Sequence, residues 1–246
     1  MLEKSKSSEH HPASLSADSK EVEAGRLSGR SPLSSGIGRF FVLRLARPLE
    51  DFLVRMEVAP NWISALGLFI TLFGCFLWAV GWLASGAILI LFGGAFDFLD
   101  GRVARRRQLA SREGAFLDSV LDRVMDAGLF FALAFYFRDS WVLWVCLVAF
   151  LGSSLTPYVR AKAESLGVES KDGLVQRPER IVILALGALL SALLRELGLL
   201  FESQALQELG AWSLIAALGL LAILSNHVAL KRARSCFREL QGKSLN

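Results

Sequence analysis

The sequence predicts an all-α, polytopic membrane protein with six transmembrane helices and an N-terminal juxtamembrane amphipathic helix. Of its 246 residues 53% are hydrophobic and only 20% charged, at a mean hydropathy of +0.46. The apolar residues form runs of about 20, long enough to cross a ~30 Å hydrocarbon core, instead of alternating with polar ones. Lysines and arginines gather in the segments of one side. These observations exclude a disordered chain and an ordinary soluble domain.

The N-terminal part predicts two elements that precede the spans. Residues 1–37 are rich in serine and mixed charges and contain no aromatic residue, so we expect a disordered cytoplasmic tail. Residues 38–56 mix phenylalanine and leucine with arginine, which predicts an amphipathic helix in the lipid headgroup region. Pro48 is expected to bend or divide that helix.

Six apolar spans follow, in which frequent glycines are typical of closely packed membrane helices. We expect them at about 62–82, 83–101, 115–137, 140–159, 181–200 and 210–230. The membrane domain then covers 38–235, and 236–246 form a cytoplasmic C-terminal tail.

The basic residues predict the orientation. They flank the start of the first span, the loops after the second and fourth spans, and the C-terminus, whereas the opposite side holds only Arg138 and Arg195. The positive-inside rule places both termini, and the charged ends of the second and third spans, on the cytoplasmic side of the cell membrane. The net charge of +4 is therefore a one-sided membrane feature and does not predict a nucleic-acid partner.

Four aspartates lie near the cytoplasmic ends of the second and third spans, where carboxylates are costly. Asp97 and Asp100 share one helix face, as do Asp118 and Asp122. A short loop makes the two helices antiparallel neighbours and can bring the faces together. Oxygen ligands alone favour Mg²⁺ or Mn²⁺, and two such ions are a common arrangement for displacement at phosphorus.

Small and basic residues accompany these aspartates. Gly101, Ala104 and Gly114 leave room for a phosphate or nucleotide beside the backbone, and Arg105 offers a fork that suits phosphate oxygens. A single aspartate is more often a helix cap or half of an ion pair, but the register of the whole set favours a binding site.

The segment from Asp97 to Asp122 reads D-F-L-D-G-R-V-A-R, eight residues, then G-A-F-L-D-S-V-L-D. It resembles the signature D-x2-D-G-x2-A-R-x8-G-x3-D-x3-D of the CDP-alcohol phosphotransferase (CDP-alcohol phosphatidyltransferase) family at every fixed position. With the six-span layout, the resemblance covers about 38–235.

The resemblance implies the roles of these residues. Asp97, Asp100 and Asp118 would hold two divalent ions, Mg²⁺ or Mn²⁺, and Asp122 would contact a metal and act as general base. The CDP-binding residues would be Asn61, Ser64, Asp97, Gly101, Ala104, Arg105 and Gly114. Alternatively, Asn61 simply caps the first span. Asp126 is no motif position, and we expect it to support the site or to pair with Arg123.

The acceptor is indicated by two further segments. Leu117 to Arg123, and Tyr158 to Val168 with Gly173 to Arg180, resemble phosphatidylinositol-phosphate synthases and archaetidylinositol-phosphate synthases. In those enzymes basic residues hold the acceptor's phosphate, and the matching residues here are Lys162, Arg177 and Arg180, with Arg160 as a further candidate. These could also be ordinary cytoplasmic loop charges. Gln176 departs from the acidic residue expected there.

The resemblance therefore implies a phospholipid synthase that transfers a phosphatidyl group from CDP-diacylglycerol to inositol 1-phosphate and releases CMP. The partners would be membrane lipids, the soluble phosphorylated alcohol and a second copy in a homodimer. Glycerol 3-phosphate, as used by phosphatidylglycerophosphate synthases, is the alternative acceptor. An ion-coupled transporter is a different class, but its site would lie near the midplane between repeats, which the sequence does not show.

Overall fold

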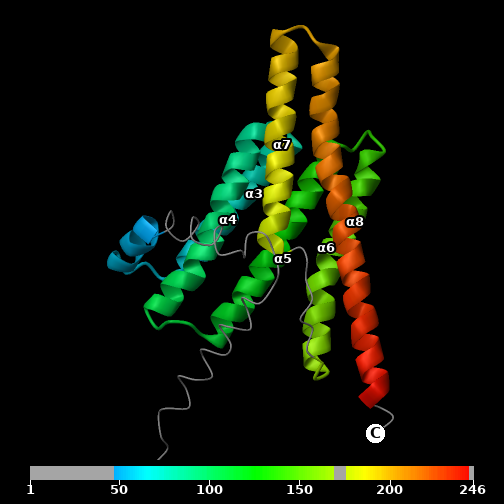
Figure 1. The fold of residues 1–246 in the computed structure, drawn as a ribbon. Helices are drawn as coiled ribbons and strands as arrows, with labels where there is room; N and C mark the ends of the chain where they lie inside the picture. The colour runs from blue at the N-terminus through cyan, green and yellow to red at the C-terminus, as the bar shows by residue number, and fades with distance from the viewer. Residues whose placement is uncertain (1–46, 169–175, 244–246) are drawn as a thin grey trace, which may run out of the picture.

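The computed structural model describes residues 47–168 and 176–243, and within them every regular element is an α-helix (Figure 1). An unlabelled helix over 47–55 comes first. The labelled helices are α3 (Pro60–Ala79), α4 (Leu83–Arg106), α5 (Arg112–Tyr136), α6 (Val142–Ser165), α7 (Arg177–Leu200) and α8 (Gln204–Lys243). Each of the six predicted apolar spans coincides with one of the labelled helices.

Helices α3 and α4 form a hairpin whose backbones touch at glycines. A Cβ atom added to Gly93 would lie 2.1 Å from the Thr71 hydroxyl and 2.8 Å from the carbonyl oxygen of Gly67. One added to Gly86 would lie 2.7 Å from the carbonyl oxygen of Gly74. Only glycine fits at such contacts, so two glycine pairs seven residues apart hold the helices together along their length.

Helices α6, α7 and α8 form a second group, in which α8 packs against both of the others. The contact between α7 and α8 is apolar, with Leu184, Leu214 and Leu218 fully buried. The contact between α6 and α8 also has polar links. The Thr156 hydroxyl donates to the Ser225 carbonyl at 3.1 Å. The buried Ser153 hydroxyl donates to the Ser225 hydroxyl at 3.4 Å.

Helix α5 connects the two groups, because it packs against α3 and against α6, while α4 packs against α7. In the described part of the chain, α4 and α5 do not pack along each other as the short loop between them suggested. The charged ends of α4 and α5 meet through side chains, because Asp97 and Asp118 offer carboxylate oxygens within 4.8 Å of each other and Arg177 of α7 contacts Asp97.

Among the described residues, five helices are long and apolar enough to cross a membrane: α3, α4, α6, α7 and α8. Large apolar side chains are exposed on the outer faces of these helices, for example Phe69, Trp144 and Ile223, as lipid contact requires. The chain is a multi-pass membrane protein. Helix α5 is not among the five, because its first half carries several charges, so a sixth span remains a prediction.

Helix α8 is longer than its predicted span. It runs over 40 residues, about 60 Å at 1.5 Å per residue, and includes 236–243, which continue the helix. At the other end of the chain, the helix over 47–55 buries Glu50 and Leu53 and exposes Phe52. The predicted tail over 1–37, and 38–46 of the predicted amphipathic helix, lie outside the described residues.

Candidate active site

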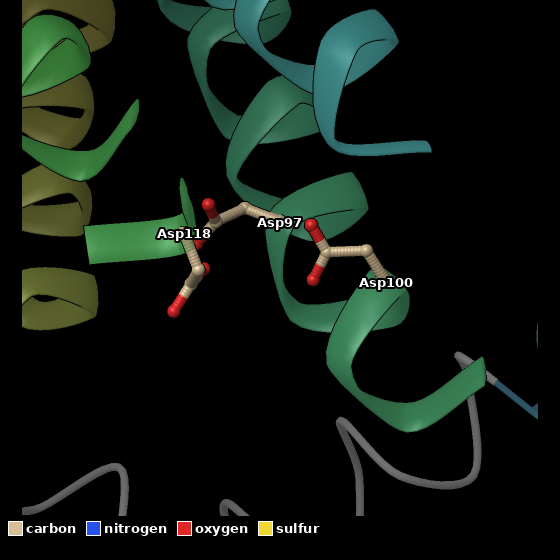
Figure 2. A group of neighbouring side chains, drawn as sticks. All are labelled: Asp97, Asp100 and Asp118. Atoms are coloured by element: carbon tan, nitrogen blue, oxygen red, sulfur yellow. The ribbon is translucent and has the colours of Figure 1, made fainter. Parts of the chain in front are cut away.

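The aspartate site comprises Asp97, Asp100, Asp118 and Asp122. Asp97, Asp100 and Asp118 each offer a carboxylate oxygen, and these oxygens lie within 4.8 Å of one another. Figure 2 shows the first two side chains leaving successive turns of α4, with Asp118 of α5 approaching Asp97 from the opposite helix. The structure therefore brings together three of the four aspartates as a group of hard oxygen donors, the type of site that suits a divalent cation.

Asp100 is the most enclosed of the three, with only 4% of its surface exposed. The Ser64 hydroxyl donates a hydrogen bond to one of its oxygens, and the backbone N–H of Gly101 donates to the other. Ser64 lies in the first turns of α3, so the hydrogen bond joins the α3–α4 hairpin at the site. Two donors fix the rotamer of this carboxylate.

Asp122 joins the group through an arginine of α7. Nη1 of Arg177 lies 2.5 Å from Asp97 Oδ2 and 2.6 Å from Asp122 Oδ1. The Asp122 oxygen is buried, and its contact with Arg177 is not a geometrically correct hydrogen bond. A buried carboxylate that shares one arginine with Asp97 and lies next to further carboxylates fits a metal ligand.

Asp126 lies one turn beyond Asp122 and is 4% exposed. Its Oδ2 accepts from Arg180 Nη2 at 2.7 Å, and its Oδ1 accepts from Arg177 Nε at 3.3 Å. The expected pairing with Arg123 is replaced by pairing with two arginines of α7. Sequence spacing could not show this, because the partners are more than 50 residues apart.

The candidate nucleotide residues surround the end of α4. The Arg105 guanidinium folds back over Gly101, where an added Cβ would lie 3.4 Å from Nη1. Ala104 is half-buried. Gly114 lies in the first turn of α5, and its N–H donates to the capping hydroxyl of Ser111 at 3.0 Å. Asp97 belongs to the aspartate site itself, and of the other candidates Ser64 and Gly101 contact it through their hydrogen bonds to Asp100.

Asn61 is exposed in the first turn of α3. The helix begins at Pro60 with Ala59 as its N-cap, so the alternative that Asn61 caps this helix is wrong. Pro60 explains the start, because proline is well suited to the first helical position, where its missing N–H leaves no hydrogen bond unmade. The Asn61 side chain is thus exposed at the start of α3.

The four candidate acceptor residues divide into two pairs. Arg177 and Arg180 lie among the aspartates, whereas Arg160 and Lys162 are exposed near the C-terminal end of α6. Arg160 Nε lies 2.8 Å from the Glu164 carboxylate one turn later. The unexpected Gln176 is the N-cap of α7.

The structure also contains a second ionic group, which the sequence did not predict. The Glu50 cluster consists of Glu50, Asp51, Arg102 and Arg106, and it joins the helix over 47–55 to the end of α4. Glu50 is 1% exposed and lies 2.5 Å from Arg102 Nη2 and 3.1 Å from Arg106 Nη1. Asp51 lies 2.5 Å from Arg106, and that hydrogen bond lowers the pKa of the Asp51 carboxyl. Adjacent carboxylates inside a basic amphipathic stretch are the signal that could have revealed it.

Comparison with known proteins assigns the chain to a family. Residues 57–223 match the family model described as CDP-alcohol phosphatidyltransferase, which covers more than half of the chain. The chain belongs to this family. It is therefore a transferase, and the matched residues include the whole aspartate site.

Two relatives of this chain are phosphatidylinositol phosphate synthases. A phosphatidylinositol phosphate synthase of Cutibacterium acnes is 38% identical over 147 residues, which cover 57% of this chain and 70% of the relative. One of Mycobacterium tuberculosis is 33% identical over 157 residues, 62% of this chain and 72% of the relative.

Solved structures agree with this assignment. Crystal structures of the phosphatidylinositol phosphate synthase of Mycobacterium tuberculosis are similar at 28% identity and a TM-score of 0.66. One, with CDP-DAG bound, is matched over 79% of this chain and 94% of that chain. Another, in complex with manganese and citrate, is matched over 77% and 88%.

Proposed function

We propose that this protein is a phosphatidylinositol phosphate synthase, which transfers the phosphatidyl group of CDP-diacylglycerol to inositol 1-phosphate and releases CMP. The observation that carries the proposal is Arg177, a guanidinium from the start of α7 that lies on Asp97 and Asp122. A fixed cation beside carboxylates that hold metal suits an acceptor that itself carries a phosphate. The names of the relatives, and the CDP-DAG of the similar crystal structure, support the same reaction.

Two divalent cations, Mg²⁺ or Mn²⁺, fit the aspartate site. Asp97, Asp100 and Asp118 would hold them together with Asp122, whose buried Oδ1 is paired with Arg177. The manganese of the similar crystal structure supports this set. When bound, the ions would neutralise the carboxylates and the charge that develops on the phosphates of the donor.

The chain's own residues move the proton and orient the reactants. Asp122 accepts the proton of the inositol hydroxyl as that oxygen bonds to the lipid-bearing phosphorus. The bond from this phosphorus to the oxygen shared with the cytidylate breaks, and CMP leaves with the electron pair. Arg177 and Arg180 attract the phosphate of the acceptor, and Lys162 and Arg160 line its approach from the cytoplasm.

The nucleotide binds at the ends of α3 and α4. Gly101, Ala104 and Gly114 leave the backbone open to the diphosphate, and the Arg105 fork pairs with its oxygens. Asn61 contacts the cytidine, and Ser64 keeps Asp100 in its orientation. What supports these roles is the shared location of the residues at one end of the bundle.

The membrane arrangement follows from the charges of the sequence. We propose that α5 is the sixth span, that both termini and the aspartate site face the cytoplasm, and that the protein is a homodimer in the cell membrane. The lysines and arginines of one side support the orientation. The family resemblance supports the dimer.

The proposal is tested by CMP release from CDP-diacylglycerol by purified protein with Mg²⁺ or Mn²⁺. Inositol 1-phosphate, glycerol 3-phosphate, free inositol and serine are offered separately to the wild type and to Arg177→Gln. We expect release with inositol 1-phosphate, and a raised KM for it in the variant. Release with glycerol 3-phosphate alone would reject the proposed acceptor and keep the reaction class. Release with free inositol as effectively as with its phosphate would reject the role of the arginines.

A further inference from the structure

Asp126 is a buried carboxylate that the family signature does not include. It lies at the meeting point of three helices, because it binds Arg180 of α7, and Arg180 Nη1 in turn donates to the Ser153 carbonyl of α6 at 3.1 Å. Arg180 is itself 5% exposed. This pair alone could be only a structural tie between α5, α6 and α7.

The second contact of Asp126 points to more than a tie. Of the nitrogens of Arg177, Nε donates to Asp126 at 3.3 Å, and Nη1 is held between Asp97 and Asp122. Among the described residues, Nη2 reaches only the Met125 sulfur, at 3.4 Å. Sulfur is a weak acceptor, so the N–H groups of Nη2 can exchange this contact for a hydrogen bond to a stronger acceptor.

The orientation of Nη2 depends on Asp126. A guanidinium is a rigid planar fork, so fixing Nε and Nη1 fixes the direction of Nη2 as well. Without the Asp126 carboxylate only Nη1 would remain anchored, and the plane could rotate about that contact. Arg180 would at the same time lose the charge that balances it in a buried position.

We propose that Asp126 is a positioning residue for the acceptor: it holds Nε of Arg177 and the guanidinium of Arg180 so that Nη2 of Arg177 faces the phosphate of the acceptor alcohol. This inference rests on the proposed function, since it takes the acceptor to be phosphorylated. Asp126 contacts neither the reacting phosphorus nor the donor. Its loss therefore weakens acceptor binding and leaves the chemical step largely unchanged.

The first test is steady-state kinetics of CMP release by Asp126→Asn. We expect the KM for inositol 1-phosphate to rise by about 10–100-fold, as for other groups that orient a binding residue. We expect kcat and the KM for CDP-diacylglycerol to stay within about threefold, because losing a contact made equally in the ground state and the transition state raises KM alone. Asp139→Asn is the matched control, since Asp139 is exposed and pairs only with its neighbour Arg138. An unchanged acceptor KM, or a matching fall in kcat, would overturn the proposal.

A double variant tests whether Asp126 acts through Arg177. In an Arg177→Gln background, adding Asp126→Asn should raise the acceptor KM much less than it does in the wild type. An equal rise in both backgrounds would contradict the proposal. If Asp126→Asn does not purify as folded protein, Asp126→Glu takes its place, because it keeps the charge and displaces the carboxylate. A wild-type acceptor KM in that variant would also count against it.

A labelling experiment separates this inference from the proposed function. Phenylglyoxal modifies accessible guanidinium groups, and the side chain of Arg177 is 11% exposed. We expect Asp126→Asn to increase labelling of Arg177, read by mass spectrometry, while Asp139→Asn does not. Unchanged labelling would overturn the positioning role whichever acceptor the enzyme uses. Increased labelling without CMP release from inositol 1-phosphate would reject the acceptor alone.

Discussion

The Glu50 cluster and the aspartate site are both built from carboxylates and arginines at the same end of α4, but their charges differ. In the Glu50 cluster, two carboxylates face two arginines, Arg102 and Arg106. Around the aspartate site five carboxylates face two arginines: Asp97, Asp100, Asp118, Asp122 and Asp126 against Arg177 and Arg180. In the Glu50 cluster each carboxylate has an arginine partner, so the cluster can serve simply to hold the helix over 47–55 against α4. The second group carries an excess of negative charge that calls for cations from outside the chain.

The largest effect on activity is expected at Asp122, because this aspartate would take part in the reaction and the members of the Glu50 cluster would not. Asp122→Asn keeps the shape of the side chain but cannot accept the hydroxyl proton, so kcat for CMP release should fall by about 10²–10⁴-fold. The rate is measured with saturating inositol 1-phosphate and Mg²⁺, with Asp139→Asn as the control. A variant with wild-type kcat would show that Asp122 is not the base.

A smaller effect is expected at Ser64, which orients Asp100. Ser64→Ala removes the hydroxyl donor, and Mn²⁺ affinity, read by electron paramagnetic resonance of the free ion, should fall by about 10–100-fold. Ser119→Ala is the matched control, because that hydroxyl donates only to the Ala115 carbonyl of its own helix. If Ser64→Ala binds Mn²⁺ as tightly as Ser119→Ala does, then metal binding by Asp100 does not depend on the Ser64 hydroxyl.

Glu50→Gln should change stability without changing chemistry. The variant leaves Arg102 without its charged partner, and losing hydrogen bonds of this type costs about 1.5–3 kcal/mol. Thermal unfolding of the detergent-solubilised protein should therefore begin at lower temperature. The KM for CDP-diacylglycerol and kcat, measured well below that temperature, should match the wild type. A selective rise of the donor KM would show that the Glu50 cluster shapes the nucleotide site.

The smallest effect is expected at Asp51, the exposed member of the same cluster. Its pKa is lowered by Arg106, so its contribution to stability is present above the ordinary carboxyl pKa and is lost as pH falls through the lowered value. Solvent and salt screen such a pair, so Asp51→Asn should not measurably change the unfolding temperature at pH 7. A clear loss at pH 7, comparable to that of Glu50→Gln, would show that the cluster acts as one unit.

The sequence predicts the helices well, because apolar runs record directly which segments lie in lipid. It also identifies the aspartates, since spacing along a helix places Asp97 with Asp100. It does not predict that α4 packs against α7, or that Arg177 and Arg180 turn to Asp126. Partner choice between distant helices depends on shape and on buried charge, and neither leaves a periodic pattern. Glu50 was missed for the same reason, because its two arginines lie on another helix.

The glycine contacts between α3 and α4 have a consequence for motion. With the Gly67–Gly93 and Gly74–Gly86 pairs in backbone contact, neither helix can roll or slide against the other without a steric clash. The two helices therefore move as one rigid body. Ser64 stands at the end of one half and Asp100 at the end of the other. Any rearrangement of the aspartate site must then involve the side chains that α5 and α7 contribute, because those of α3 and α4 stay fixed relative to one another.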